Sequence, residues 1–259
     1  MSPTLPIYYL TQLLLFVVFI LTNTGDMIQY IKRLGDYMQI DINNLSFAYG
    51  HKLVLEKLSL IVNPGSFLVI RGKNGTGKTT LIKCLLGINL VKNGMIFYDH
   101  NDINSFKDWT SVGYVSQVID EFNYEFPITV NELLNITRLR KVKENRKLKL
   151  LDQMGILEIL NENIGSLSGG QLQRVFIVKS ILNHPSLLIL DEPTASIDKK
   201  NVEYFYETVN QLNAEGTTII LITHDEYLDS YNYSHVLQMN SDFSYAFRKR
   251  NAIEEKEAK

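Results

Sequence analysis

The 259-residue sequence is poor in cysteine and has no surplus of basic residues. Its one cysteine, Cys84, excludes an intrachain disulfide and a metal cluster held by several cysteines. With a net charge of -2 at pH 7, the chain has no excess of basic residues of the kind that is typical of nucleic-acid-binding proteins. We find no internal repeat and no low-complexity segment. We therefore expect one large domain, or one domain with an insertion, and no nucleic-acid partner.

Long apolar runs are also scarce. The strongest, residues 7–21, is interrupted by Thr11 and Gln12 and falls short of the roughly 20 residues of a membrane-spanning helix. A signal peptide would have basic side chains before its apolar run, and residues 1–6 contain none. We expect residues 1–37 to be an apolar extension outside the natural protein, because Met38 opens an alternating strand pattern and Gly35-Asp36 can be encoded by the ribosome-binding signal GGAGAT. A membrane-touching arm is the alternative.

The chain is organised around one glycine-rich stretch that fits the pattern G-x-x-x-x-G-K-[ST]. An apolar strand pattern at 67–70 precedes it, and apolar residues at helical spacing follow it. Glycines let backbone N–H groups turn inward, and the helix N-terminus adds a positive dipole end, so we predict a phosphate-binding loop. The predicted nucleotide-binding residues here are Gly72, Lys73, Asn74, Gly75, Thr76, Gly77, Lys78, Thr79 and Thr80.

Specific roles follow for two of these residues. Lys78 is expected to reach the β and γ phosphates of ATP, and the Thr79 hydroxyl to ligate Mg²⁺ beside them. Further along, the apolar stretch 187–190 ends in Asp191 and Glu192. Charges at the carboxyl end of a buried strand lie at the ligand-binding edge of a parallel sheet. We predict that Asp191 holds Mg²⁺ and that Glu192 polarises the attacking water.

The remaining chain alternates strand and helix patterns, which indicates a parallel α/β core. Residues 38–47 and 58–62 are expected to form an antiparallel layer, and residues 127–165 an inserted helical subdomain. The basic stretch 138–149 is typical of a solvated helix face, and a phosphate-binding role is the alternative. We predict a nucleotide-binding domain over 38–241 and a charged tail over 242–259.

A second motif, LSGGQ, occupies residues 167–171 and directly precedes a helical run. A serine and two glycines at a helix N-terminus form another anion-binding surface. At this point the chain resembles the nucleotide-binding subunits of ABC transporters, whose signature is LSGGQ. The resemblance covers residues 38–239 and implies an α/β P-loop NTPase core of the ABC type with an antiparallel β layer and an inserted helical subdomain. It implies nucleotide contacts from Ser168, Gly169, Gly170 and Gln171.

Four further residues match elements of this family. Tyr49 matches the aromatic residue that stacks on adenine. Gln117 matches the glutamine that senses Mg²⁺ and the attacking water. Asp198 matches the loop that couples two sites across a dimer, and His224 matches the switch histidine at the γ phosphate.

The resemblance also implies a mechanism and partners. In the family the signature loop contacts the γ phosphate held by a second subunit, so two copies would share two ATP molecules and their Mg²⁺ ions. ATP hydrolysis would drive separate transmembrane permease subunits from the cytoplasmic face of the membrane, with Lys78, Glu192, Gln117 and His224 as catalytic residues. An extracellular solute-binding protein would take part indirectly.

The cargo is indicated by a shorter resemblance. The stretch 113–117, an acidic and aromatic spacer and the residues FPITV at 126–130 resemble the zinc, manganese and iron-chelate importer branch. We therefore expect uptake of a divalent metal, zinc or manganese. An exporter or another small-molecule importer is one alternative, and a non-transport ABC ATPase is the other.

Overall fold

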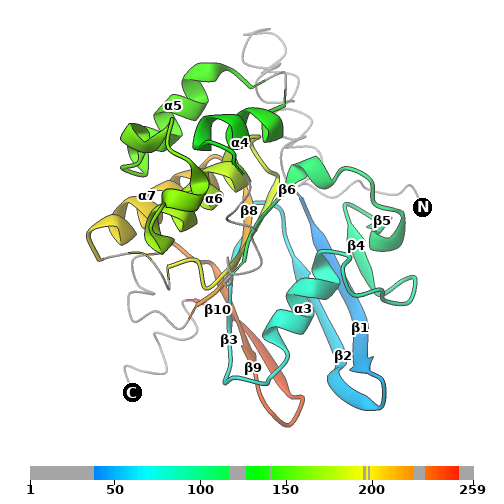
Figure 1. Cartoon of the computed structure of the whole chain (residues 1–259). Helices are drawn as coiled ribbons and strands as arrows, with labels where there is room; N and C mark the ends of the chain where they lie inside the picture. Colours follow the sequence, from blue (N-terminus) through cyan, green and yellow to red (C-terminus); the bar gives the residue numbers. More distant parts are fainter. Residues whose placement is uncertain are drawn as a thin grey trace, which may run out of the picture.

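The structure, a computed structural model, describes residues 38–116, 127–139, 142–194, 197, 199–223 and 231–250. Its strands form two sheets (Figure 1). The antiparallel sheet follows the order β2-β1-β4-β5 and consists of β1 Ile40–Tyr49, β2 Lys52–Val62, β4 Ile96–Tyr98 and β5 Asn101–Asp102. β1 and β2 alternate between buried and more exposed positions along much of their length, as expected when one face of a sheet packs on a core.

The second sheet has the order β10-β9-β3-β8-β7-β6. It consists of β3 Phe67–Arg71, β6 Val112–Val115, β7 Leu187–Asp191, β8 Thr218–Ile222, β9 His235–Met239 and β10 Tyr245–Lys249. The strands from β9 to β6 are parallel, and β10 pairs antiparallel with β9. The carboxyl ends of the parallel strands therefore meet at one edge of the sheet, where ligands bind in open α/β folds.

The helices lie on both faces of this second sheet (Figure 1). They are α3 Lys78–Leu85, α4 Val130–Thr137, α5 Glu144–Gln153, α6 Gly169–Ile181 and α7 Lys199–Ala214. α3 packs between the second sheet and the antiparallel layer, whereas α4 to α7 gather on the opposite face. Within the described ranges, no helix is both long and apolar enough to span a bilayer.

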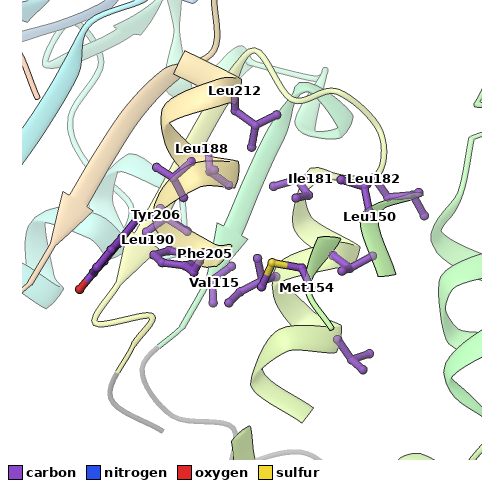
Figure 2. Close-up of a cluster of buried hydrophobic side chains, with 14 of the residues drawn as sticks. Val115, Leu150, Met154, Ile181, Leu182, Leu188, Leu190, Phe205, Tyr206 and Leu212 are labelled. Carbon is purple, nitrogen blue, oxygen red and sulfur yellow. The ribbon is translucent and has the colours of Figure 1, made fainter. Parts of the chain in front are cut away.

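Neighbouring residues of the central strands face two different cores. Phe67 and Val69 of β3 pack in the core shared with α4 to α7, while Leu68 and Ile70 pack in the core shared with α3 and the antiparallel layer. Figure 2 shows part of the first core, with apolar side chains from β6, β7, α5, α6 and α7 packed together. Continuous burial on both faces explains why β3 is apolar at four successive positions, all of them buried, before the exposed Arg71.

The helical segment between β6 and β7 begins with a capping box. The Glu132 backbone N–H donates to Thr129 Oγ1 (3.2 Å), and the Thr129 backbone N–H donates to Glu132 Oε2 (2.8 Å). These bonds satisfy N–H groups at the start of the helix, so α4 begins at Val130. The segment continues through α5 and the 3₁₀ helices Leu157–Ile159 and Ile164–Ser166. The subdomain boundaries at 127 and 165 stay a prediction.

Two expectations differ from the structure. β2 begins at Lys52 rather than at Leu58, because its pairing with β1 continues to a tight turn after Tyr49. The assignment of residues 242–250 to a charged tail is wrong: the chain turns after β9 and forms β10, whose ladder with β9 outweighs the charge of Arg248 and Lys249. The predicted extension, residues 1–37, and the end of the predicted tail, residues 251–259, lie outside the described residues.

Candidate nucleotide-binding site

The glycine-rich loop joins β3 to α3 at the carboxyl edge of the parallel sheet (Figure 1). Gly75 has φ 84° and Gly77 has φ 95°, a backbone conformation that side chains disfavour. A Cβ atom on Gly77 would lie 3.0 Å from the Val54 carbonyl oxygen of β2. A Cβ atom on Gly72 would lie 2.6 Å from the Met239 carbonyl oxygen at the end of β9. The loop therefore needs glycine both for its turn and for its close packing.

Lys78 is the first residue of α3 and is 7% exposed. Its Nζ atom donates to the carbonyl oxygens of Gly72 (2.7 Å) and Lys73 (3.1 Å), so the ammonium group is held against the loop. Desolvation lowers the pKa of Lys78, and the negative charges of Glu192 and Asp191 partly oppose this shift. The ammonium group is therefore partly desolvated and well suited to a polyanionic ligand.

Asp191 is the last residue of β7 and is 4% exposed. Desolvation and the adjacent Glu192 raise the pKa of its carboxyl group to about 6, against the opposing effect of Lys78 and Lys83. A buried carboxylate with an incompletely balanced charge is a suitable ligand for a divalent cation. Thr79 lines the same cleft as Asp191, so a hydroxyl and a carboxylate oxygen, both ligands that Mg²⁺ accepts, are available together.

Glu192 follows Asp191 with φ 47°, in the left-handed region that a non-glycine residue seldom occupies. Its backbone N–H still donates to the Ile222 carbonyl oxygen of β8 (2.9 Å), so the turn begins within the sheet's hydrogen-bonding pattern. The side chain of Glu192 lines the cleft together with Asp191. Backbone strain of about 1–3 kcal/mol at a cleft residue is typical of functional sites.

These elements enclose one open cleft of about 650 Å³. Tyr49, at the end of β1, lines it with a side chain that is 49% exposed. The Tyr49 ring contacts Phe47 edge to face (5.0 Å between centroids), and its hydroxyl accepts a hydrogen bond from Asn89 Nδ2 (3.0 Å). The phosphate-loop side of the cleft is lined by Asn74, Gly75, Gly77, Lys78, Thr79 and Thr80.

The other predicted loop residues support the cleft without being among its lining residues. Gly72 packs against Met239, as described above. The Lys73 carbonyl oxygen accepts from the Thr76 hydroxyl (2.9 Å) as well as from Lys78, which braces the loop from within. The structure therefore brings the predicted phosphate loop, Tyr49, and the acidic pair Asp191 and Glu192 to one site.

The LSGGQ motif lies elsewhere in the chain, at the start of α6. Ser168 is its N-cap: Ser168 Oγ accepts from the Gln171 backbone N–H (3.3 Å), and Gln171 Oε1 accepts from the Ser168 backbone N–H (2.9 Å). Ser168 and Gly169 are exposed, and a Cβ atom on Gly169 would meet no other atom within 4 Å. Gly170 is half-buried. The described lining of the cleft contains no residue of this motif.

Three predicted site residues, Gln117, Asp198 and His224, lie outside the described residues. Their predicted roles therefore stay predictions. The strands that lead to two of them are described: β6 ends at Val115 and β8 ends at Ile222. Both strands belong to the parallel part of the sheet and end at the edge that carries Asp191.

Sequence reasoning missed several residues of the site. Lys52, Leu53 and Val54 line the cleft from the start of β2, and Ser241 and Phe243 line it from the turn between β9 and β10. The alternating pattern of 52–62 could have revealed the first group. No local motif marks the second group, and Phe243 falls in the segment 242–259 that is predicted to be a charged tail.

Gln173 of α6 was also missed. It is 2% exposed, and its Nε2 atom donates to the Pro193 carbonyl oxygen (3.1 Å), directly after the acidic pair. Its Oε1 atom is buried and has no hydrogen-bond partner among the residues that the structure describes. Gln173 therefore links the helix that carries the LSGGQ motif to the loop that follows Glu192.

A phosphate loop between a parallel strand and a helix, with an acidic pair at the end of a nearby strand, defines a P-loop nucleotide-binding protein. A family model for the ABC transporter domain matches residues 55–195. The chain is 39% identical over 211 residues to the zinc uptake system ATP-binding protein ZurA of Listeria innocua, across 78% of this chain and 82% of that protein. It is 34% identical over 197 residues to the high-affinity zinc uptake system ATP-binding protein ZnuC of Bacillus subtilis, across 72% of this chain and 84% of that protein.

Solved structures agree with this result. The structure of cbiO1 from Clostridium perfringens, part of an ABC transporter complex, matches with a TM-score of 0.69 and 27% identity, across 85% of this chain and 92% of that chain. The chain belongs to the ABC transporter family and is an ATP-binding subunit of this family, a transport ATPase. The predicted fold class and the predicted ATPase activity are thereby confirmed.

Proposed function

We propose that this chain powers the uptake of a divalent metal ion, zinc in the first place, by hydrolysing ATP for separate membrane permease subunits. The observation that carries the cargo is the 39% identity to a Listeria zinc uptake ATP-binding protein over 82% of its length. The acidic and aromatic spacer before residues 126–130 favours the same importer branch. Manganese is the alternative cargo.

The chain's own groups bind the phosphates of ATP. Backbone N–H groups of the loop and the N-terminus of α3 attract the β and γ phosphates. The Lys78 ammonium, which donates to two loop carbonyl oxygens, is close enough to the cleft to donate to phosphate oxygens instead. It would neutralise negative charge that develops on the γ phosphoryl group during hydrolysis.

The residues present fit a magnesium ion. The Thr79 hydroxyl and the Asp191 carboxylate would hold it, with Gln117 as a further ligand that lies outside the described residues. When bound, the ion would supply positive charge to the β and γ phosphate oxygens. The raised pKa of Asp191 favours this role, because a cation nearby would stabilise the ionised carboxylate.

Glu192 is the proposed general base. Its carboxylate lines the cleft beside Asp191, where it would orient a water molecule and accept its proton as the oxygen attacks the γ phosphorus. His224 and Gln117 are proposed to sense the γ phosphate and the attacking water.

A second copy of the chain is proposed to complete each ATP site. The exposed Ser168 and Gly169 at the start of α6 leave the positive end of this helix open to an anion. Together with Gly170, Gln171 and Asp198, they would contact the γ phosphate of ATP held by the partner. Closure of this dimer on ATP, and its opening after hydrolysis, would drive the permease.

The chain would accordingly act at the cytoplasmic face of the membrane as a peripheral subunit. Its direct partners would be a second copy of itself and the permease subunits. An extracellular solute-binding protein would deliver the metal ion to the permease and would not contact this chain.

The substitution Glu192→Gln tests the catalytic assignment. We expect the variant to bind ATP as the wild-type protein does and to lose nearly all turnover, because an amide cannot accept the proton of water. Equilibrium ATP binding and steady-state phosphate release measure the two properties. Glu207→Gln, an exposed carboxylate on α7, is the matched control and should hydrolyse ATP normally. Normal turnover by Glu192→Gln would refute the role.

The cargo is tested in cells that depend on this chain for transport. Uptake of labelled zinc and of labelled manganese is measured with the wild-type protein, Glu192→Gln or Glu207→Gln. Loss of zinc uptake in Glu192→Gln alone supports the proposal, and loss of manganese uptake alone names the alternative cargo. Unchanged uptake of both ions, when no other importer operates, would reject a metal cargo and leave the ATPase assignment intact.

A further inference from the structure

The nucleotide cleft has two aromatic side chains in its lining, and they come from different sheets. Tyr49 ends β1 in the antiparallel layer, whereas Phe243 lies in the turn between β9 and β10 of the parallel sheet. Their side chains are 49% and 36% exposed. In Figure 1 the turn of the β1–β2 hairpin and the turn of the β9–β10 hairpin extend toward the same end of the molecule as the phosphate loop. Exposed rings in a cleft are available for a flat, apolar ligand group.

The turn that carries Phe243 is well defined by hydrogen bonds. The Asp242 carboxylate accepts from the Ser244 backbone N–H (3.0 Å) and hydroxyl (2.6 Å). The Asn240 backbone N–H donates to the Ser244 carbonyl oxygen (3.1 Å), and the Phe243 backbone N–H donates to the Asn240 carbonyl oxygen (3.3 Å). Phe243 itself has φ 61°, which is a rare conformation for a bulky side chain. A glycine or an asparagine would fit this turn with less strain, so the ring needs another explanation.

The hairpin is also fixed to both sides of the cleft. At the end of β9, the Met239 carbonyl oxygen lies so close to Gly72 that a Cβ atom there would approach it to 2.6 Å. At the start of β10, the Tyr245 hydroxyl accepts a hydrogen bond from the Glu56 backbone N–H of β2 (2.9 Å). The first contact sets the hairpin against the phosphate loop, and the second sets it against the strand that follows Tyr49 in the chain. Phe243 is thereby placed by the framework of the cleft.

We propose that Phe243 is a base-contacting residue, which offers the purine ring of the nucleotide a second aromatic surface in addition to Tyr49. This inference rests on the proposed nucleotide site and extends it to a residue that no motif marks. Aromatic rings bind any base through its π face and recognise no hydrogen-bonding pattern. Phe243 would therefore strengthen the binding of a purine nucleotide and would have no effect on a bare polyphosphate, which the loop alone can bind.

The test compares a nucleotide with its phosphate portion. Binding of ADP and of inorganic pyrophosphate, each with Mg²⁺, is measured by titration calorimetry on the full chain. We expect Phe243→Ala to bind ADP about fivefold to tenfold more weakly than the wild-type protein, because half-exposed stacking is worth the low end of the usual range. Its pyrophosphate affinity should be unchanged. Phe247→Ala is the matched control, since Phe247 is 41% exposed on β10 but stacks on His235 and is not among the lining residues of the cleft.

A second variant distinguishes the effect of losing the ring on ADP binding from an effect on the stability of the fold. Phe243→Gly can adopt φ 61° without strain, so its thermal unfolding midpoint should be at least that of the wild-type protein, while its ADP affinity falls as in Phe243→Ala. Phe243→Tyr, which keeps the ring, should bind ADP within about twofold of wild type.

Three results would overturn the inference, and they are distinguishable. If Tyr49→Ala weakens ADP binding and Phe243→Ala does not, the nucleotide site stands and the role of Phe243 is rejected. If Phe243→Ala weakens pyrophosphate as much as ADP, the residue acts on the phosphate loop and not on the base. If the wild-type protein binds neither ligand, the proposed nucleotide site itself is wrong and the inference fails with it.

Discussion

Two lysines are buried among the residues that the structure describes, and they have opposite surroundings. Lys78, in the cleft, is 7% exposed, and Lys147, in the helical segment, is 1% exposed. The ammonium of Lys78 donates to two backbone carbonyl oxygens, which carry only partial charge. The ammonium of Lys147 has a carboxylate partner and two side-chain amide partners. One lysine retains capacity to bind an anion, and the other is already neutralised.

The partners of Lys147 come from two helices. Glu144, one turn earlier in α5, lies 2.5 Å from Nζ, and Asn131 and Asn135 of α4 accept from it at 2.5 and 2.9 Å. Arg138 pairs with the same glutamate (3.0 Å). The interpretation of this basic stretch as a solvated helix face is therefore wrong for Lys147, because its aliphatic part is buried and its charge joins α4 to α5. Lys147, which has a carboxylate partner, stabilises the packing of two helices. Lys78, which is held by neutral carbonyl groups in a cleft, can bind an anionic ligand.

The largest effect is expected from Lys78→Ala. It should lower ATP hydrolysis by about 10²- to 10³-fold, because a positioned charge beside the γ phosphate is lost. The free energy of unfolding should change by less than about 1 kcal/mol, since removal of the Lys78 side chain, which lines the open cleft, lets water reach the two carbonyl oxygens. Phosphate release and urea unfolding measure these quantities. Lys83→Ala, exposed on the same helix, is the control, and an equal loss of hydrolysis in both variants would contradict the assignment.

The substitution Lys147→Ala should show the reverse pattern. We expect it to lower the free energy of unfolding by about 3 kcal/mol, because it leaves Glu144 and two amide oxygens without their shared donor and opens a cavity. Lys147→Met, which keeps most of the side-chain volume, should cost less. ADP affinity of the folded protein should stay within about twofold of wild type. Urea unfolding and calorimetry provide the measurements, and weaker ADP binding without lost stability would place Lys147 in the nucleotide site instead.

The raised pKa of Asp191, which lines the same cleft as Lys78, predicts that the free energy of unfolding depends on pH. Folding raises the pKa of Asp191 from its ordinary 3.8 to about 6, so the folded protein binds this proton more tightly than the unfolded chain. Ionisation of Asp191 thus lowers the free energy of unfolding as the pH rises from about 4 to about 6. Above pH 6 the free energy of unfolding stays lower by the same amount. Without nucleotide or divalent cation, Asp191→Asn should be more stable than wild type at pH 7 by on the order of 1 kcal/mol.

Chemical unfolding of both proteins at several pH values checks this expectation. The difference between Asp191→Asn and wild type should grow between pH 4 and pH 6 and then level off. A difference that is constant with pH would mean that the substitution acts through packing or hydrogen bonding and not through the charge of Asp191.

The smallest effect is expected from Glu144→Gln, which converts the surroundings of Lys147 into neutral oxygen atoms like those around Lys78. The carboxylate is 48% exposed, so its loss should cost about 1 kcal/mol or less. Added salt should reduce the difference from wild type, because screening weakens the ion pair that the variant lacks. Urea unfolding at low and high salt measures it, and a cost as large as that of Lys147→Ala would show that the carboxylate is the main partner.

The features that could be predicted from the sequence depend on short separations along the chain. The phosphate loop, its helix and the acidic pair are each marked within a few residues, because glycine φ angles and strand ends are local properties. The fold class followed from these motifs, and the family from the resemblance that the LSGGQ signature carries; both are confirmed. The roles of individual site residues stay predictions, including those of Gln117, Asp198 and His224.

The features that were missed depend on packing between distant segments. The tail assignment failed at β10 because a charged strand is stabilised by its ladder with β9, which its own composition does not reveal. The burial of Lys147 was missed because its partners on α4 are 12 and 16 positions away.

Local patterning specifies a P-loop ATPase with its phosphate loop and acidic pair, since each of these motifs encodes its own backbone conformation. The part of the cleft lining that contains Phe243 is specified only by the register of the assembled sheets. The Glu56 backbone N–H meets the Tyr245 hydroxyl across 189 positions of the chain, and Met239 packs against Gly72. These long-range contacts place Phe243 in the lining of the nucleotide cleft, and no local sequence pattern predicts them.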